Sequence, residues 1–401
     1  MSVSRRRVLV FYAATMLFWF CLYTYVPILT PYVEHLGGSL FMAGLIVGSY
    51  GFAQLLVRVP IGIWSDRLGT RKVFLLAGFG FALASSLGFA LSGSVWMALV
   101  SRALAGVAAG SWVAFTVLFA GYFPPDEAPK AMGVISFYTS AAQMAATALG
   151  GLAAQMYGWR APFFLGAAGG LCGLLIALWI AEPKRAARSS LRAAELLKMG
   201  GEWPLLSVSL LAVLAQGVTF TTMFGFTPLY AAHLGADKGA LGLLTLLSTL
   251  ANAVAGYISG TLVARLVGER LTAAAGFFIG ALGTAAIPLV HTVPLLLATQ
   301  AVNGFGQGLS MPILMGLAIR SIASERRATA MGFFQAIYSL GMFGGPVFVG
   351  WAGGHIGLAG GFFCMSLVSL AAAALCIAWI LPGRRRAAAP ESVSTLKQTG
   401  I

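Results

Sequence analysis

The chain has 401 residues, of which 59% are hydrophobic and only 9% are charged, and its mean hydropathy is +0.88. A soluble domain is normally about a quarter charged, so we expect lipid to cover much of this protein's surface. The net charge of +14 does not indicate nucleic-acid binding, because the basic residues lie in short loops between apolar runs. The four cysteines lie inside apolar runs without metal-binding spacing, so we expect no metal site and no cofactor.

Apolar runs of bilayer-crossing length recur along the chain. They must be helical in lipid, because an open backbone would leave its polar groups unpaired. The first run follows Arg5, Arg6 and Arg7, and its length of about 22 residues exceeds the ~7–15 of a signal peptide, so we expect a retained helix. Twelve spans are expected, at roughly 8–32, 39–64, 73–92, 95–120, 131–155, 161–181, 204–231, 239–264, 271–290, 293–319, 329–353 and 359–381.

The loop charges predict the orientation. With the N-terminus in the cytoplasm, the outer loops carry only Arg160 and Lys238, and the apolar runs carry only Arg58 and Arg102. All the others of the 25 lysines and arginines fall on the cytoplasmic side, which places both termini there by the positive-inside rule. We therefore expect a multi-pass protein of the cytoplasmic (inner) membrane, and we expect it to be a monomer.

Segment 182–203 separates the first six runs from the last six. Its portion from Leu191 to Lys198 alternates apolar and charged positions at helical spacing, which predicts a short helix on the cytoplasmic face; a disordered charged linker is the alternative. The expected domains are an N-terminal six-helix bundle at 1–181, this linker, a C-terminal six-helix bundle at 204–383 and a cytoplasmic tail at 384–401.

The two halves repeat each other at a nearly constant offset. Arg102-x-x-x-Gly106-x-x-x-Gly110 matches Gln300-x-x-x-Gly304-x-x-x-Gly308 at 198 residues, and Glu34-His-Leu-Gly37 matches Ala232-His-Leu-Gly235 at the same offset. A duplicated six-helix unit explains this regularity. The expected fold is therefore an all-α membrane protein whose twelve transmembrane helices form two pseudo-twofold-related six-helix bundles around a midplane site.

Between the second and third runs stands Gly62-Ile-Trp-Ser-Asp66-Arg67-Leu-Gly69-Thr-Arg71-Lys72. It resembles the signature loop of the major facilitator superfamily, G-x-x-x-D-R-x-G-x-R-K; an ordinary basic turn is the alternative. Its glycines allow a tight turn and close helix contact, and its carboxylate can accept hydrogen bonds from a helix N-terminus. The resemblance implies a latch between the halves that stabilises an outward-facing state, formed by Gly62, Asp66, Arg67, Gly69, Arg71 and Lys72. The second half has Ala264 where the carboxylate would stand, which implies one latch.

The fourth run carries Arg102-Ala-Leu-Ala-Gly106, which is similar to a second motif of the superfamily, R-x-x-x-G. The resemblance implies a part in proton coupling for Arg102; a structural pair or a place near the membrane interface is the alternative. Arg58 could line the cavity or extend to the cytoplasmic interface. The Gly-Pro pair that drug/proton antiporters carry in their fifth helix is absent from Ala146–Gly151, so this motif does not support an antiporter.

Gln300, Asn303 and Gln307 share one face of the tenth run, at i, i+3 and i+7. The resemblance places the tenth helix at the central cavity, so we expect these amides to contact substrate; helix–helix hydrogen bonding is the alternative. Further candidates for the cavity are Gln216, Tyr138, Gln335 and Tyr338.

The acidic residues fall in loops or at helix ends, and the histidines fall at the predicted outer ends, so no carboxylate or imidazole is expected near the midplane. A cavity that holds Arg102 and amides should disfavour organic cations and favour neutral or anionic solutes. Proton coupling would then use Asp66 or Glu34, which lie at opposite ends of the bundle.

The resemblance is closest to the twelve-helix drug and metabolite efflux branch. The expected function is secondary active transport of a small amphiphilic solute across the cytoplasmic membrane by alternating access, as proton-linked efflux. The alternatives are a facilitator or proton symporter that imports a small polar metabolite, and a non-transporting membrane sensor with the same fold. Enzymatic activity is not expected, because the sequence has no intramembrane catalytic cluster. The expected partners are a small-molecule substrate, protons and the lipid bilayer, without nucleic acid.

Overall fold

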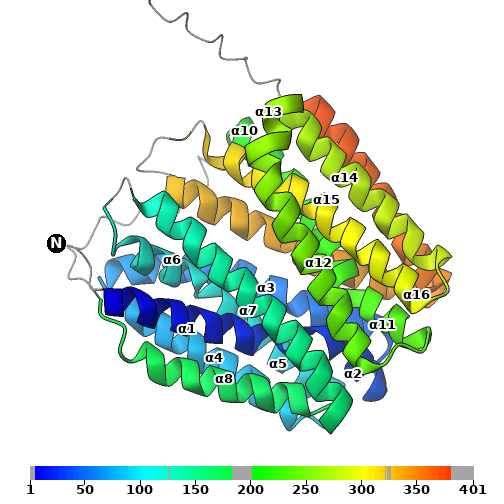
Figure 1. The fold of residues 1–401 in the computed structure, drawn as a ribbon, viewed down its shortest axis with the longest axis horizontal. Helices are drawn as coiled ribbons and strands as arrows, with labels where there is room; N and C mark the ends of the chain where they lie inside the picture. The colour runs from blue at the N-terminus through cyan, green and yellow to red at the C-terminus, as the bar shows by residue number, and fades with distance from the viewer. Residues whose placement is uncertain (1–4, 125–126, 183–200, 321, 323–326, 381–401) are drawn as a thin grey trace, which may run out of the picture.

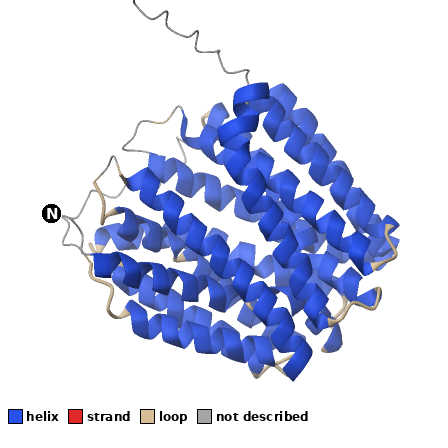
Figure 2. Ribbon diagram, in the orientation of Figure 1, coloured by secondary structure: helices blue, strands red, loops and turns tan. Residues whose placement is uncertain are grey.

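The computed structural model describes residues 5–124, 127–182, 201–320, 322 and 327–380, apart from the side chains of 66, 128–130 and 328–329. Within these ranges the protein consists of helices and loops, without β-strands (Figure 2). The expected all-α membrane class is confirmed for this part of the chain. The linker helix expected at 191–198 and the tail at 384–401 lie outside the described residues.

The first span of the first half is divided into two helices. A 3-10 turn that contains Pro27 separates them, because proline has no N–H group to continue the helical hydrogen bonding. The fourth span is likewise divided at Ser111. The helices of this half are α1 (Arg5–Tyr23), η1 (Val26–Ile28), α2 (Leu29–His35), α3 (Leu40–Arg67), α4 (Lys72–Ala90), α5 (Val95–Gly110), α6 (Trp112–Ala120), α7 (Ala128–Tyr157) and α8 (Ala161–Ala177).

The first span of the second half is also interrupted, by a π-helical turn that ends just before Pro228. Both halves therefore place irregular backbone at a similar point of their first span. The helices of this half are α10 (Trp203–Thr221), η2 (Thr222–Phe226), α11 (Thr227–His233), α12 (Lys238–Ile258), η3 (Ser259–Val263), α13 (Ala264–Val267), α14 (Glu269–Ala286), η4 (Ile287–Leu289), α15 (Val293–Arg320) and α16 (Arg327–Trp379).

Nine helices of the described residues are long and apolar enough to cross a membrane when α16 counts once. Gly357 in α16 has a φ of +74°, which glycine tolerates, so 327–356 and 358–379 are two helical arms. α7 and α8, with 30 and 17 residues, are helical over ranges that were expected to span. Hydropathy alone identifies nine spans, and the count of twelve crossings stays a prediction.

The helices of the first half lie beside those of the second, from blue to green and from green to red in Figure 1. Glycines let the halves approach closely. A Cβ on Gly44 of α3 would lie 2.2 Å from the carbonyl oxygen of Pro346 in α16, and one on Gly242 of α12 would lie 2.7 Å from that of Thr147 in α7. Gly44 and Gly242 are separated by the repeat offset of 198, and Thr147 and Pro346 by 199. The halves therefore meet through equivalent pairs of positions, as a duplicated unit predicts.

The two ends of the bundle differ in how the halves meet. We call the end with Glu34 and His233 the Glu34 end, and the end with Gly69 and Arg71 the Arg71 end. Hydrogen bonds and ring contacts between the halves extend from the Glu34 end to the level of Arg58, about two-thirds of the way along α3. Among the described residues, we find no such contact closer to the Arg71 end. The protein is therefore held in a state that is joined at the Glu34 end.

Candidate functional site

Arg58 of α3 joins the two halves deep in the bundle. Its Nη1 donates to Gln335 Oε1 at 2.6 Å and to Tyr338 Oη at 3.3 Å in α16. Its Nη2 donates to Gln54 Oε1, one turn earlier on the same face of α3. Arg58 is only 7% exposed. Of the two alternatives for this residue, the structure therefore supports a place in the interior and not one at the membrane interface.

Arg102 of α5 is buried between two tyrosine rings, with 2% of its surface exposed. Its Cζ lies 4.3 Å from the ring centre of Tyr50 and 5.8 Å from that of Tyr25. Such cation–π contacts contribute about 0.5–2 kcal/mol, whereas an arginine in the middle of a membrane helix costs at least about 2.5–3.5 kcal/mol. Its Nε and Nη1 have no hydrogen-bond partner, so the rings leave donors of this charged group unused.

Gly106, one turn after Arg102, sets the distance between α5 and α3. A Cβ at this position would lie 2.4 Å from the carbonyl oxygen of Tyr50, so any larger residue would push the helices apart. The glycine thus brings the Tyr50 ring beneath the Arg102 guanidinium. The R-x-x-x-G motif therefore works as a unit in which one residue supplies charge and the other supplies helix contact.

Aromatic rings from both halves surround this charged region. Tyr50 stacks on Phe220 of α10 with ring centres 5.9 Å apart, and Tyr23 of α1 contacts Phe224 of η2 at 5.7 Å. The region near Arg102 is therefore lined by aromatic side chains that come together across the boundary between the halves. Such a lining suits the apolar part of an amphiphilic ligand.

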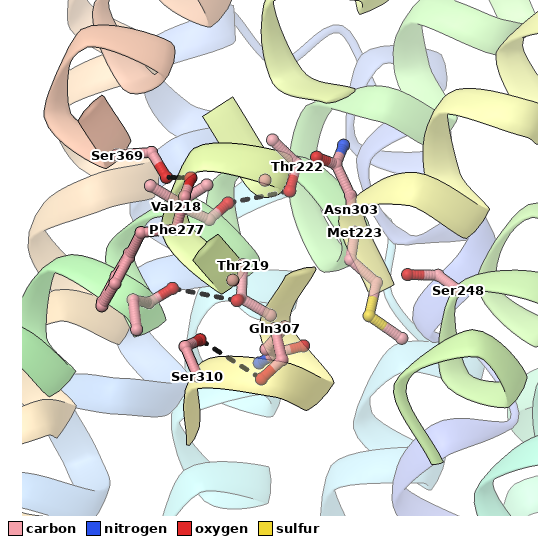
Figure 3. A pocket seen from close by; sticks show the side chains of 13 residues that line it. Val218, Thr219, Thr222, Met223, Ser248, Phe277, Asn303, Gln307, Ser310 and Ser369 are labelled. Carbon is pink, nitrogen blue, oxygen red and sulfur yellow. Dashed lines mark hydrogen bonds between the residues drawn. The ribbon is translucent and has the colours of Figure 1, made fainter. Parts of the chain in front are cut away.

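A narrow cavity lies inside the second half (Figure 3). Its lining mixes apolar side chains with hydroxyl and amide groups and contains no charged side chain. Thr219 and Thr222 donate to backbone carbonyls one turn back in their own helix. Asn303 Nδ2 and Ser248 Oγ are buried without a hydrogen-bond partner. This cavity can accept a neutral polar group but offers no charge to a ligand.

The amide stripe predicted on α15 is divided between two environments. Asn303 and Gln307 line the cavity of the second half, but both also bond to neighbouring helices: Thr284 Oγ1 donates to Asn303 at 3.1 Å, and Asn252 Nδ2 donates to Gln307 at 3.1 Å. Gln300 does not line this cavity, and its amide donates to the adjacent Thr299 hydroxyl at 3.4 Å. Helix–helix bonding therefore accounts for part of the stripe.

The remaining residues expected at the cavity also lie in different environments. Gln216 is buried, and its Oε1 has no hydrogen-bond partner, so it is free to accept one. Tyr138 of α7 stacks on Tyr12 of α1 with ring centres 4.4 Å apart, which is a contact within the first half. Gln335 and Tyr338 are the partners of Arg58.

The signature loop lies at the Arg71 end, where Glu182 accepts hydrogen bonds from Thr70, Arg71 and Lys72. Gly69 has a φ of +65°, which explains the glycine at this turn. Glu182 accepts hydrogen bonds from the backbone N–H groups of Arg71 and Lys72 and from the Thr70 hydroxyl, so a carboxylate caps the N-terminus of α4. Arg67 is exposed.

The role expected of this loop as a latch stays a prediction. Gly62 leaves room for close helix contact, and no described residue lies within 4 Å of a Cβ placed there. The side chain of Asp66, which is expected to be the central residue of the latch, lies outside the described residues. Among the described residues, this open space at Gly62 agrees with the position of the contacts between the halves, which lie from the Glu34 end to the level of Arg58.

A clasp of four side chains joins the halves at the Glu34 end, and we call it the Glu34 clasp. His233 Nε2 lies 2.9 Å from Glu34 Oε1, and Lys238 Nζ lies 4.1 Å from the ring centre of Trp159. Glu34 and His233 are about half exposed, at 49% and 48%. An exposed pair of this kind is worth about 0.2–1 kcal/mol, so the clasp is a weak and reversible contact.

Sequence reasoning missed several of these residues. Tyr25 and Tyr50 were not identified, because sequence spacing gives no sign that they face Arg102. Gln54 had a detectable signal, because it precedes Arg58 by four residues on the same apolar run. Glu182 also had one, since it directly follows the last apolar run of the first half. His233 gave a signal as the repeat counterpart of His35.

Comparison with known proteins places this architecture in one family. The family model described as Major Facilitator Superfamily matches residues 11–235 and 208–399. An uncharacterised transporter of this type from Methanocaldococcus jannaschii is 25% identical over 348 residues, which cover 83% of this chain and 87% of the relative. The bacillibactin exporter of Bacillus subtilis is 24% identical over 80% of this chain and 84% of its own length.

The fold itself is also found among solved structures. A bacterial homologue of the human lysosomal transporter Spinster superposes with a TM-score of 0.76 at 16% sequence identity, covering 92% of this chain and 95% of the homologue. This likeness concerns the fold alone. The family match extends over both halves, including the signature loop and the R-x-x-x-G motif. The chain is therefore a member of the major facilitator superfamily of membrane transporters.

Proposed function

We propose that the protein exports a small amphiphilic solute, neutral or anionic, by alternating access between two six-helix halves. The observation that carries this proposal is the position of the charged and aromatic site. Arg58 and the rings around Arg102 lie where the contact between the halves ends, so a solute bound there is closed off toward the Glu34 end. The similarity to the bacillibactin exporter supports the direction of transport.

Alternating access requires that the contacts between the halves form and break. Gly44 and Gly242 each place backbone against backbone across the halves. The halves can pivot at these contacts, because no side chain there has to move. Opening toward the Glu34 end would separate Arg58 from Gln335 and Tyr338. The latch of Asp66, Arg67 and Arg71 would then close the Arg71 end. Solute moves in one direction only if its affinity differs between the two states.

We place the protein in the cytoplasmic membrane, as a monomer with both termini in the cytoplasm. The loop charges support this orientation, since Arg160 and Lys238 are the exceptions at the Glu34 end. The Glu34 end then faces outward, and the state described is closed outside. The Spinster homologue with the similar fold is described as inward-facing.

Proton coupling is the second element of the proposal. The described acidic side chains lie at helix ends or in loops, so a coupling carboxylate would have to be Glu34 or Asp66 with Arg102 acting on it. Glu34 already pairs with His233 across the halves, at the end that is joined in this state. Import of a polar metabolite would use the same site. A facilitator would follow the inward gradient of the solute, and a symporter would follow the inward gradient of protons.

The test is a flux assay with purified protein in liposomes, with and without an imposed pH gradient. We expect uptake of neutral or anionic amphiphiles to depend on the gradient, and Asp66→Asn and Arg102→Ala to reduce it. Glu269→Gln is the matched control, because Glu269 is an exposed carboxylate in the corresponding loop of the second half. Flux that ignores the gradient would indicate a facilitator, and no flux of any solute by the wild type would contradict the proposal.

A further inference from the structure

Two arginine side chains of the first half are buried on neighbouring helices, and no described carboxylate pairs with either of them. The Cζ atom of Arg102 lies 4.3 Å from the ring centre of Tyr50, and Arg58 follows Tyr50 by about two turns on the same helix. They are carried by neighbouring helices in contact, because a Cβ on Gly110 of α5 would lie 3.9 Å from Cγ of Arg58. The ion pairs of the described residues involve neither arginine. This region therefore concentrates positive charge in a place that water reaches poorly.

Several hydrogen-bond donors of this region are unused. The Nε atoms of both arginines, Nη1 of Arg102 and the amide nitrogen of Gln54 are buried without a partner. Buried donors are normally paired, and buried charges are normally neutralised. A hydrogen-bond acceptor that carries negative charge would satisfy these four donors and would balance the charges of the two arginines.

We propose, on the basis of the transport function above, that the substrate is an organic anion. Its carboxylate, sulfonate or phosphate group binds between Arg58 and Arg102, and its apolar part lies against Tyr50, Phe220 and Phe224. Guanidinium groups suit this role because their planar array of N–H donors matches the oxygens of such anions. Organic cations are excluded by two positive charges that the described side chains do not offset.

The same geometry connects binding to movement of the halves. Arg58 Nη1 now donates to Gln335 and Tyr338 of the second half. An anion on Arg58 competes for those donors, and so weakens the contact that holds the halves together in this state. Bound substrate therefore favours separation of Arg58 from α16, which is the differential affinity that transport needs.

The test is a binding measurement on the purified full chain in detergent, without any gradient. The probes are naphthalene-2-sulfonate, its neutral analogue 2-naphthol and the cationic N,N,N-trimethyl-2-naphthylammonium, followed by isothermal titration calorimetry. We expect the sulfonate to bind at least tenfold more tightly than 2-naphthol, and the ammonium probe to bind most weakly. In Arg58→Gln and Arg102→Gln the ratio of sulfonate to 2-naphthol affinity should fall below threefold.

Controls separate charge from folding. Arg265→Gln removes an exposed arginine of the second half and should leave the preference unchanged. Arg58→Lys and Arg102→Lys keep the charge and should retain a preference for the sulfonate of at least threefold, which covers the case in which a glutamine variant does not fold. Equal affinities in the wild type, tighter binding of the ammonium probe, no binding of the sulfonate, or an unchanged preference in all folded arginine variants would overturn the inference.

The outcome can be read separately from the transport proposal. A protein that prefers the sulfonate but moves no solute in liposomes supports the anion site and contradicts transport. A protein that moves only neutral or cationic solutes, without preference for the sulfonate, supports transport and contradicts the anion site.

Discussion

The two halves of the molecule share their helix contacts but differ in the side chains that face the centre. Gly106 of α5 packs on the backbone of Tyr50, and its repeat counterpart Gly304 of α15 packs on the backbone of Ser248. Tyr50 and Ser248 are themselves counterparts at the offset of 198 residues. Corresponding helices therefore touch through corresponding positions in each half, while the residue at the contact is an aromatic tyrosine in the first half and a small serine in the second.

The charges have diverged most. At the same offset, Arg102 corresponds to Gln300 and Arg58 corresponds to Gly256, so both buried arginines belong to the first half alone. The second half offers amides and hydroxyls to its cavity instead. The difference teaches that helix contact and chemistry evolve separately: small residues must stay where backbones touch, whereas a side chain that faces an open space can change.

The largest effect is expected where the halves are alike. Gly304→Ala places a Cβ 2.0 Å from the Ser248 carbonyl oxygen, and Gly106→Ala places one 2.4 Å from that of Tyr50. Overpacking of this kind costs about 1–3 kcal/mol, occasionally more. We therefore expect both variants to lower the thermal unfolding temperature in detergent, Gly304→Ala at least as much as Gly106→Ala.

The control for these variants is a pair of glycines with space around them. No described residue lies within 4 Å of a Cβ at Gly62 or Gly260, and alanine is favoured over glycine in a helix by roughly 0.5–1 kcal/mol. Gly62→Ala and Gly260→Ala should therefore unfold at the same temperature as the wild type or slightly higher. If all four variants were equally stable, close helix contact would not be the reason why glycine is needed at positions 106 and 304.

The next effect concerns a residue that only the first half has. Arg58→Ala removes hydrogen bonds from a charged group to Gln335 and Tyr338, each worth about 1.5–3 kcal/mol. We expect the state joined at the Glu34 end to lose at least about tenfold in population relative to the alternative state. Spin labels at the exposed positions Leu68 and Leu266, one in each half at the Arg71 end, would report this as a shift toward shorter distances.

Gly256→Ala is the matched control, since Gly256 is the counterpart of Arg58 in the second half. A Cβ there would lie 3.7 Å from Pro312 Cγ, which is ordinary contact. The distance distribution should therefore stay that of the wild type. A distribution unchanged in Arg58→Ala would show that this arginine does not hold the halves together.

Much of this comparison could be predicted from sequence, because it rests on periodic features. The apolar runs correspond to the helices, and the repeat offset correctly paired Gly106 with Gly304. The buried arginine at 102 was also found, since a charge in an apolar run is a local signal. The break between α1 and α2 was missed, although Pro27 and Pro31 lie there, because apolar character continues through the turn.

Contacts between distant positions could not be predicted in this way. Arg58 and Gln335 are 277 residues apart, and no local pattern says that they meet. Three amides on one face of α15 were expected to act together, yet Gln300 bonds to its neighbour Thr299 while Gln307 bonds to α12. Helical spacing gives the direction of a side chain from its own axis, but only the packing of the other helices determines what it faces.

A smaller effect is expected at the Glu34 clasp, where the halves differ at one position of the repeat. Glu34 corresponds to Ala232, so a single carboxylate faces His233 and the opposite pairing cannot form. Because both side chains are about half exposed, the pair is worth about 0.2–1 kcal/mol. Glu34→Gln and His233→Gln should each shift the Leu68–Leu266 distance distribution in the same direction as Arg58→Ala, but by no more than about fivefold in population.

The double variant tests whether this contact is a pair. If Glu34 and His233 act through each other, the double variant should behave like either single one, which is the signature of coupling in a double-mutant cycle. Additive effects would instead indicate that each residue acts through separate neighbours, and the clasp would lose its central contact.

The smallest effect is expected for an ion pair that lies inside one half. Arg320 of α15 and Glu269 of α14 form an exposed pair at the Arg71 end, with 52% and 42% of their side chains accessible. Since both belong to the second half, their contact is the same whichever way the halves are arranged. Arg320→Gln should therefore change stability by at most about 1 kcal/mol and leave the Leu68–Leu266 distances unchanged. A shift in those distances as large as that of His233→Gln would mean that the second half does not move as one unit, and the division into two halves with separate internal and mutual contacts would have to be redrawn.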